Sequence, residues 1–303
     1  MPPLISQRPP TIDAAAASRW AQFLYAANPA ASAWLHEEVA RRMEQRLQWI
    51  VKQPKRWLHW QPLRGGLAIH PVLAQRYPQA QCVVVQSPHA TVPLVQRAIA
   101  KPWWDVRRWR APTVQFGPPS APVQMLWANM SLHMDADPQA LITRWHSLLE
   151  ADGFVMFSCL GPDTLRELRQ LYAALGWPAP AHEFTDMHDW GDMLLQAGFA
   201  EPVMDMERIT LTFSSAEHLL AELRGLGRNL HPQRFAGLRG RRWHAALKAH
   251  ITQALADPDQ PGRLRLGFEI IYGHAFKPSP RIPVRAQTSV SLDDFRTALQ
   301  KRA

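Results

Sequence analysis

Short apolar runs alternate with segments of helical periodicity along most of this chain. The apolar runs are rich in β-branched and aromatic residues and end at turn residues, which is typical of buried strands. They occupy residues 56–60, 81–86, 113–116, 123–128, 154–159, 202–213 and 264–276. Because single helices of ordinary length separate the strands, the pattern predicts βαβ units and a mostly parallel sheet.

Capping residues and helix breakers set the expected helix boundaries. Asp137 is a favourable N-cap for a helix whose first residue is Pro138, a position at which Pro is preferred. Ser32 and Asp163 are expected to cap two further helices in the same way. The predicted helices cover residues 13–31, 32–53, 66–77, 88–99, 138–149, 164–175, 186–196, 215–225 and 240–255.

These elements predict one α/β domain over residues 54–278, which carries a helical insertion, 214–262, before the last strand. An N-terminal arm and helix, 1–53, precede the domain, and a Pro-rich tail, 279–303, follows it. With 303 residues, 47% of them hydrophobic, the chain is long enough to bury a core without disulfide bonds. Its two cysteines, Cys82 and Cys159, lie in apolar runs, so we expect buried thiols in a cytoplasmic protein.

The chain carries a formal charge of +9, with 34 Lys and Arg against 25 Asp and Glu. An excess of this size favours an anionic partner, which leaves nucleic acid, an anionic membrane surface and an acidic protein open. A membrane helix is not expected, because no apolar run approaches the roughly 18 residues that such a helix needs.

Motifs for other chemistries are weak or missing. Trp and Arg alternate over residues 103–110, a pattern that binds single-stranded nucleic acid or packs as a Pro-rich loop on the sheet. No nucleic-acid-binding module accompanies this segment, so nucleic acid is not expected as the main partner. The histidines lack metal-ligand spacing, so no metal site is predicted. The chain has neither a Gly-x-Ser-x-Gly nucleophile elbow nor a phosphate-binding Gly-x-x-x-x-Gly-Lys loop.

Several segments of the C-terminal half carry a specific resemblance. They read Asn129-Met-Ser-Leu-His133, Gly153-Phe-Val-Met-Phe-Ser158, Phe184-Thr-Asp-Met-His188 and Tyr272-Gly-His274-Ala-Phe-Lys. In these segments the chain resembles the class I methyltransferases of early biotin synthesis, the malonyl-acyl-carrier-protein O-methyltransferase family, and the match covers roughly 32–278. The resemblance implies a Rossmann-like seven-stranded sheet, S-adenosylmethionine as methyl donor, and the free carboxylate of malonyl-acyl carrier protein as acceptor.

The resemblance also implies candidate acceptor residues. Asn129, His133 and Tyr272 are the expected catalytic residues, since a carboxylate needs positioning rather than a strong base. The acidic carrier protein is the expected partner of the positively charged chain. Its predicted binding residues are His274 and four arginines of the helical insertion, where the alternative is a solvated basic face: Arg224, Arg228, Arg241 and Arg242. For Tyr272 and His274 the alternative is packing on the last strand, with their polar ends satisfied.

The donor loop departs from the family pattern. By the resemblance it spans residues 57–65, Trp-Leu-His-Trp-Gln-Pro-Leu-Arg-Gly. In the family, glycines let the backbone approach the donor, and an acid after the second strand binds the ribose hydroxyls. Here the loop acid falls on His59, Gly65 alone remains of three glycines, and the ribose-binding acid falls on Gln86. Asn129, which also belongs to the donor site, matches the family.

Two hypotheses follow from this departure. Trp60 stacks on the donor adenine in an active methyltransferase with a divergent donor site, which uses His59, Gly65 and Gln86 as its binding residues. Alternatively, Trp57 or Trp60 fills the former pocket, because an indole ring buries a large apolar area. The chain is then a catalytically silent relative that binds a protein partner, either the carrier protein or an active methyltransferase.

Overall fold

The computed structural model of the chain describes residues 12–22, 33–100 and 113–279. The N-terminal arm up to residue 11, the proposed cap Ser32, the Trp/Arg segment 103–110 and the tail beyond residue 279 lie outside these ranges. Among the described helices, none is long and apolar enough to cross a membrane.

A seven-stranded mixed sheet forms the centre of the fold, with the strand order β3-β2-β1-β4-β5-β7-β6. The first five strands in this order are parallel, and β7 runs antiparallel to both of its neighbours. The strand bounds are β1 Arg56–Trp60, β2 Gln81–Val85, β3 Gln115–Phe116, β4 Val123–Ala128, β5 Leu149–Leu160, β6 Ala200–Phe213 and β7 Leu264–Phe276. The predicted α/β class and the Rossmann-like seven-stranded sheet are therefore confirmed.

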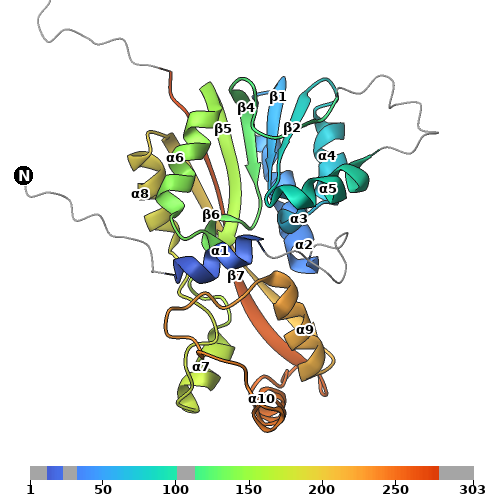
Figure 1. The fold of residues 1–303 in the computed structure, drawn as a ribbon, viewed down its shortest axis with the longest axis vertical. Helices are drawn as coiled ribbons and strands as arrows, with labels where there is room; N and C mark the ends of the chain where they lie inside the picture. Colours follow the sequence, from blue (N-terminus) through green and yellow to red (C-terminus); the bar gives the residue numbers. More distant parts are fainter. Residues whose placement is uncertain (1–11, 23–32, 101–112, 280–303) are drawn as a thin grey trace, which may run out of the picture.

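Helices cover both faces of the sheet and cluster below one end of it (Figure 1). Their bounds are α1 Ala14–Gln22, α2 Trp34–Arg46, α3 Pro62–Gly65, α4 Ile69–Arg76, α5 Val92–Ile99, α6 Pro138–Leu148, α7 Arg166–Ala174, α8 Met187–Gln196, α9 Ala216–Leu226 and α10 Arg241–Ala254. One apolar cluster joins α2 and α4 to the sheet, and another joins α6 and α8 to its opposite face. Helices α7, α9 and α10 gather around the extended end of β7, where α10 contacts the other two (Figure 1).

Of the capping predictions, the one at Asp137 is confirmed and the one at Asp163 is wrong. Asp137 accepts the N–H of Ala140 at 3.0 Å and caps α6, as expected from the sequence. Asp163 does not cap α7, because its carboxylate pairs with Arg166 and Arg208 instead. The helix starts after Leu165, which adopts a left-handed conformation with φ 59°.

The helix predicted over 32–53 is shorter in the structure. It ends at Arg46, and a 3-10 turn over Leu47–Trp49 follows. Ile50 is extended and buried, which turns the chain toward β1 before Pro54 is reached. The cap position is held by Ala33, which makes no side-chain capping bond.

Candidate active site

The parallel strands β1, β2 and β4 end at the same edge of the sheet, and hydrogen bonds join the segments that follow them. Gln61, directly after β1, donates its backbone N–H to Val85 at the end of β2, at 2.8 Å. Asn129, directly after β4, binds the carbonyl oxygen of Gly65. This is the edge at which open α/β sheets bind ligands, and the resemblance places the methyl donor there.

Short helix α3 occupies the position of the Gly-rich loop. Gln61 stands where the first glycine of the motif would be, and it adopts the left-handed conformation, with φ 51°, that glycine favours. Pro62 and Leu63, which follow it, are buried. The loop therefore turns at once into a packed helical turn.

Two glutamine side chains hold this turn to the end of β2. The side-chain oxygen of Gln61 accepts the backbone N–H of Ser87 at 3.1 Å and lies 3.3 Å from the amide nitrogen of Gln86. The side-chain oxygen of Gln86 accepts the N–H of Leu63 at 3.2 Å. We call this arrangement the Gln61–Gln86 clasp.

Gln86, the predicted ribose-binding residue, is engaged within the chain. Its amide nitrogen lies 2.9 Å from the carbonyl oxygen of Ser87 and 3.1 Å from the hydroxyl of Thr91, besides its contact with Gln61. The residue is 8% exposed. Both polar ends of the Gln86 amide therefore have partners from the protein itself.

Gly65 and Asn129 fix α3 against the end of β4. A Cβ atom on Gly65 would lie 2.6 Å from the backbone oxygen of Asn129, a separation that no side chain tolerates. The Asn129 amide nitrogen donates to the carbonyl oxygens of Gly65 and of His36, the latter at 2.8 Å, and its side-chain oxygen accepts the Ser158 hydroxyl at 2.6 Å. Asn129 is fully buried and clamps three segments together, so packing alone accounts for both family-like residues.

The two aromatic candidates of the donor loop point into the core. Trp60 packs edge-on against Trp145 of α6, and the Arg144 guanidinium lies over its ring. His59 faces the opposite apolar cluster, where its Nδ1 lies 3.2 Å from Nδ1 of His70. Burial, together with the charge of a protonated His70, holds the pKa of His59 well below its usual range. Neither ring is presented to a donor.

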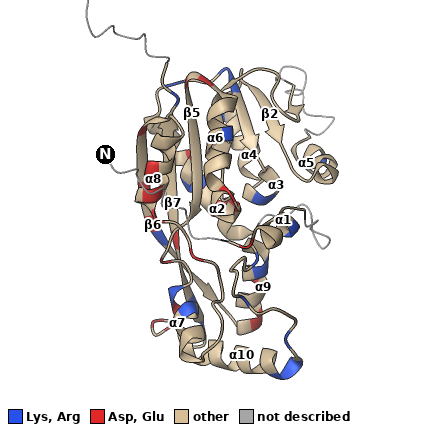
Figure 2. Ribbon diagram, turned by 60° about the vertical axis from the view of Figure 1, so that its left-hand side comes forward, with Lys and Arg blue, Asp and Glu red and all other residues tan. Residues whose placement is uncertain are grey.

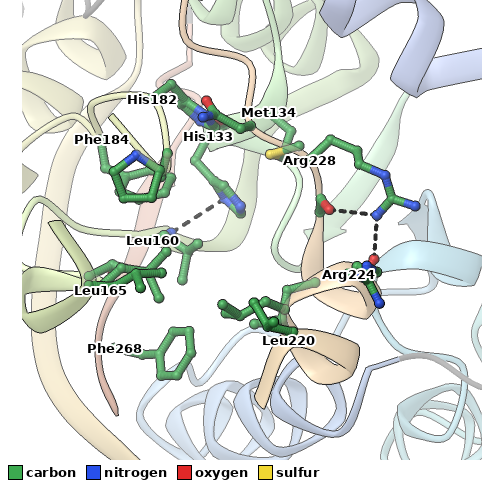
Figure 3. A pocket seen from close by; sticks show the side chains of 18 residues that line it. His133, Met134, Leu160, Leu165, His182, Phe184, Leu220, Arg224, Arg228 and Phe268 are labelled. Atoms are coloured by element: carbon green, nitrogen blue, oxygen red, sulfur yellow. Dashed lines mark hydrogen bonds between the residues drawn. The ribbon is translucent and has the colours of Figure 1, made fainter. Parts of the chain in front are cut away.

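An apolar pocket of about 230 Å³ lies beside this edge, between the 3-10 turn Leu132–Met134, α7 and α9 (Figure 3). This volume is somewhat below the ~300 Å³ at which drug-sized ligand pockets begin, and it suits a short acyl chain. Its apolar lining includes Leu160, Leu165, Phe184, Leu220, Leu223 and Phe268.

Two buried histidines supply the polar wall of the pocket. His133 accepts the backbone N–H of Leu160 through Nδ1 at 3.4 Å, so the neutral ring carries its proton on Nε2 (Figure 3). Burial and the nearby His182 hold the pKa of His133 well below its usual range, which keeps the ring neutral at pH 7. His182 donates from Nε2 to the carbonyl oxygen of His133 at 2.9 Å, and burial lowers its pKa to about 4.

Arg224 and Arg228 line the same pocket from α9 and the turn after it (Figure 3). Arg228 donates to the carbonyl oxygens of Arg224 and Gly227, and its guanidinium lies over the ring of Trp20 in α1. No ion pair or hydrogen bond engages the Arg224 guanidinium among the residues that the structure describes. The structure thus brings together His133, Arg224 and Arg228 of the predicted acceptor residues.

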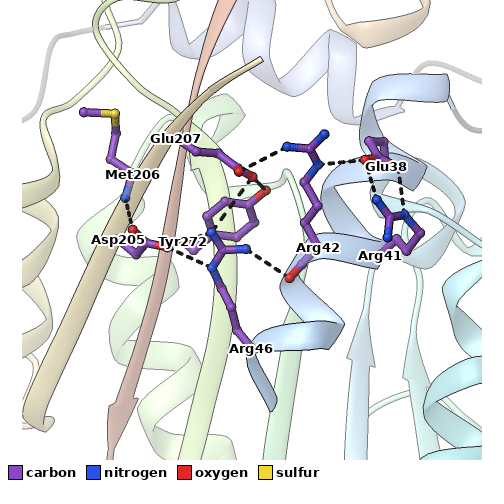
Figure 4. Close-up of polar contacts among 8 residues, drawn as sticks. All are labelled: Glu38, Arg41, Arg42, Arg46, Asp205, Met206, Glu207 and Tyr272. Carbon is purple, nitrogen blue, oxygen red and sulfur yellow. Dashed lines mark hydrogen bonds and ion pairs between the residues drawn. The ribbon is translucent and has the colours of Figure 1, made fainter. Parts of the chain in front are cut away.

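The other predicted acceptor residues lie elsewhere. Tyr272 donates its hydroxyl hydrogen to Glu207 and lies under the Arg46 guanidinium, in an ion-pair network between α2, β6 and β7 (Figure 4). Burial and Glu207 raise the pKa of Tyr272 far above its usual range. His274 packs edge-on against Phe276, and neither Tyr272 nor His274 lines the pocket.

Arg241 and Arg242 are exposed at the start of α10, in the lower part of the molecule (Figure 2). They do not line the pocket, so they have no part in holding an acceptor group inside it. A role for them in docking a carrier protein stays a prediction.

The contribution of His182 and of the apolar face of α9 to the pocket was not predicted from the sequence. His182 lies in an irregular segment before α8, where no periodicity indicates which way a side chain points. The signal on α9 was present, because Leu220, Leu223 and Leu226 recur at helical spacing along one side of the helix.

Two solved structures share the fold of this chain. A proposed methyltransferase from Bacillus halodurans C-125 matches 80% of this chain and 100% of its own, with a TM-score of 0.52 and 14% identity. The YcgJ protein from Bacillus subtilis matches 79% of this chain and 99% of its own, with a TM-score of 0.50 and 12% identity. The fold is that of the class I methyltransferases.

Curated relatives narrow this class to one family, although no family model matches the chain. A malonyl-[acyl-carrier protein] O-methyltransferase from Gallionella capsiferriformans is 37% identical over 267 residues, which cover 83% of this chain and 87% of that relative. Proteins of the same name from Laribacter hongkongensis and Legionella pneumophila are 36% and 31% identical over 89% and 82% of this chain, and over 89% and 85% of their own lengths. The chain belongs to the malonyl-[acyl-carrier protein] O-methyltransferase family.

Proposed function

We propose that the chain acts on malonyl-acyl carrier protein and methylates the free carboxylate of the malonyl group, at an early step of biotin synthesis. The pocket carries this proposal, because it combines apolar walls with Arg224 at its rim and a neutral histidine, His133, inside. Family membership supports it, since the curated relatives bear the name of this reaction. Methylation turns the charged end of the acyl group into a neutral ester.

The residues of the pocket suit a short acyl group that ends in a carboxylate. The leucine and phenylalanine side chains accept the methylene carbon, which a carbonyl and a carboxylate flank in the malonyl group. The Nε2–H of His133 is a donor for one carboxylate oxygen, and the Arg224 guanidinium supplies the opposite charge. A carboxylate is already nucleophilic, so these side chains need only hold it in place.

S-adenosylmethionine is the donor that the resemblance implies, and it would supply an activated methyl group. The described residues at the ends of β1 and β2 do not fit it in their present arrangement. The N–H of Leu63 is bonded to Gln86, and the two family acids correspond to His59 and Gln86, which carry no negative charge at neutral pH. Donor binding therefore requires the loop to rearrange.

The test is methyl transfer from radiolabelled S-adenosylmethionine, at millimolar concentration, to three acceptors: malonyl-acyl carrier protein, acetyl-acyl carrier protein and malonyl-coenzyme A. We expect base-labile label on the malonyl carrier protein, less on malonyl-coenzyme A and none on the acetyl form. Equal labelling of the malonyl and acetyl forms would show that the carboxylate is not the acceptor. Better labelling of malonyl-coenzyme A would remove the carrier protein from the proposal.

A catalytically silent relative is the second candidate, and the Gln61–Gln86 clasp is the observation that favours it. Such a chain would keep the pocket for the malonyl group and bind the acidic carrier protein, or an active methyltransferase, without transferring a methyl group. The net charge of +9 suits an acidic partner in either case. Binding of malonyl-acyl carrier protein without any methyl transfer at millimolar donor would favour this candidate.

A further inference from the structure

The donor side of the sheet edge differs from an ordinary ligand site in the state of its polar groups. A site that binds a nucleoside offers free backbone N–H groups and an acceptor for the ribose hydroxyls. Here the Leu63 N–H, the Ser87 N–H and both ends of the Gln86 amide are bonded to one another or to Gln61. The groups that would recognise a donor are used to hold the loop.

The backbone of the loop is secured from a second side. Glu37 of α2 accepts the N–H groups of Leu67 and Ala68 with its carboxylate, at 2.9 and 3.2 Å. His36 lies 2.7 Å from the carbonyl oxygen of Arg64 through Nδ1. The turn from Gln61 to Ala68 is therefore fixed by side chains that follow β2, that follow β4 and that belong to α2. Within it, the clasp is formed by Gln61 and Gln86, two residues that depart from the family pattern.

We propose that the Gln61–Gln86 clasp closes the donor site, so that an adenosine-containing sulfonium donor or its thioether product binds only when the clasp opens. This inference rests on the proposed function for the nature of the ligand. According to this inference, the neutral side chains of Gln61 and Gln86 control access of the donor, while the acceptor pocket is already formed.

Calorimetric titration with S-adenosylhomocysteine, the stable product analogue, tests the clasp directly. The variants are Gln61→Gly, which restores the glycine at a left-handed position and releases Gln86, and Gln86→Glu, which restores the acid. For the wild-type chain we expect binding no tighter than about 1 mM, and for the double variant at least tenfold tighter binding. Each single variant should lie between the two.

Two matched substitutions control for general effects. Glu201→Gly places glycine at another left-handed position, with φ 52°, at an exposed site on β6. Gln96→Glu adds the same charge on the exposed side of α5. Both should bind S-adenosylhomocysteine as weakly as the wild-type chain, and an equal gain in either would overturn the assignment to the clasp.

Hydrogen exchange of the wild-type chain gives a second readout that does not depend on folding of a variant. We expect protection of the Leu63 and Ser87 amides in the wild-type chain without ligand, because Gln86 and Gln61 accept them. Where the Gln61→Gly chain is folded, its Ser87 amide should exchange faster, since the acceptor is gone. Micromolar binding of S-adenosylhomocysteine by the wild-type chain would overturn the proposal, as would rapid exchange of the wild-type Leu63 amide. A folded double variant with no gain in affinity would do the same.

Failure of the clasp and failure of the proposed function give different results. If the clasp proposal is wrong, the wild-type chain binds the donor product readily and still discriminates malonyl- from acetyl-acyl carrier protein. If the proposed function is wrong, the carrier-protein forms bind equally or not at all, whatever the variants do with S-adenosylhomocysteine.

Discussion

The two sides of the sheet edge contrast in how their polar groups are used. On the proposed acceptor side, Arg224 and His133 line an apolar pocket of about 230 Å³, and no ion pair or hydrogen bond engages the Arg224 guanidinium among the described residues. On the donor side the amides of Gln61 and Gln86 are bonded within the chain. The loop after β4, which runs from Asn129 to His133, joins the two sides. In one fold, the polar groups of one ligand site can thus be used for bonds within the chain, while those of the neighbouring site stay available to a ligand.

Acidification sharpens this comparison, because each side buries one histidine with a pKa lowered to about 4: His36 at the donor side and His182 at the pocket. The unfolded chain then binds more protons, so stability is complete above pH 6.5 and is lost as the pH falls toward 4. From pH 7 to pH 5 we expect a loss of about 2 kcal/mol for each ring.

Urea unfolding of the wild-type chain and of His36→Gln and His182→Gln, at both pH values, measures this loss. Each variant should lose only the share of its own ring, about 2 kcal/mol, because glutamine keeps a hydrogen-bond donor without titrating. The buried His59 and His133, whose pKa values are also held well below the usual range, keep the rest of the pH dependence in all three proteins. A pH dependence that is the same in all three proteins would contradict the assignment to these rings.

Gly65→Ala tests whether the donor-side glycine is retained for packing. The added Cβ would meet the backbone oxygen of Asn129 at 2.6 Å, so the loop must shift, and we expect a loss of about 3 kcal/mol in the free energy of unfolding. Gly191→Ala in α8 is the matched control, since its Cβ would meet only a flexible methionine side chain at 3.9 Å. The control should be neutral or stabilising by up to about 1 kcal/mol. Equal stability of both variants would show that the contact with Asn129 does not constrain the loop.

Arg224→Ala tests the acceptor side alone. Loss of a charge-assisted hydrogen bond should weaken binding of malonyl-acyl carrier protein about tenfold and leave the acetyl form unchanged. Arg97→Ala is the control: it removes an exposed arginine of α5 that does not line the pocket, and it should change the affinity for neither form of the carrier protein. A parallel loss for the malonyl and acetyl forms would place Arg224 against the carrier protein rather than the carboxylate.

Tyr272→Phe has the smallest expected effect. It removes the hydrogen bond to Glu207 and keeps the ring under Arg46, so we expect a loss of about 1 kcal/mol in stability and unchanged binding of malonyl-acyl carrier protein. Thermal unfolding and the same binding assay provide the two readouts. A large loss of acceptor binding with normal stability would show that Tyr272 takes part in binding the acceptor.

The strand bounds show what the sequence specifies by itself. The predictions 56–60, 123–128 and 264–276 match β1, β4 and β7, because each apolar run is flanked by residues that break a strand. The start of α7 was wrong, since Asp163 binds the distant Arg208 rather than the helix. Ion pairs between residues distant in the sequence decide where such a helix begins, and local capping rules do not include these pairs.

The placement of the site residues likewise depended on contacts between distant parts of the chain. His133 lies in the segment directly after β4, so its place at the sheet edge follows from the topology, whereas Arg224 was assigned to the acceptor by the resemblance. Tyr272 lies outside the pocket, because alternation tells which face a strand residue takes, and not how far along the strand the pocket lies. The clasp could not be predicted from the sequence, because it depends on the contact of two side-chain amides that lie 25 residues apart in the chain.

The most direct test of the contrast is one calorimetric experiment on the wild-type chain, with S-adenosylhomocysteine added first and malonyl-acyl carrier protein second. We predict no binding heat from the nucleoside product up to about 1 mM, followed by a micromolar isotherm for the carrier protein. Micromolar binding of S-adenosylhomocysteine, with no response to malonyl-acyl carrier protein, would contradict a closed donor side and a formed acceptor pocket.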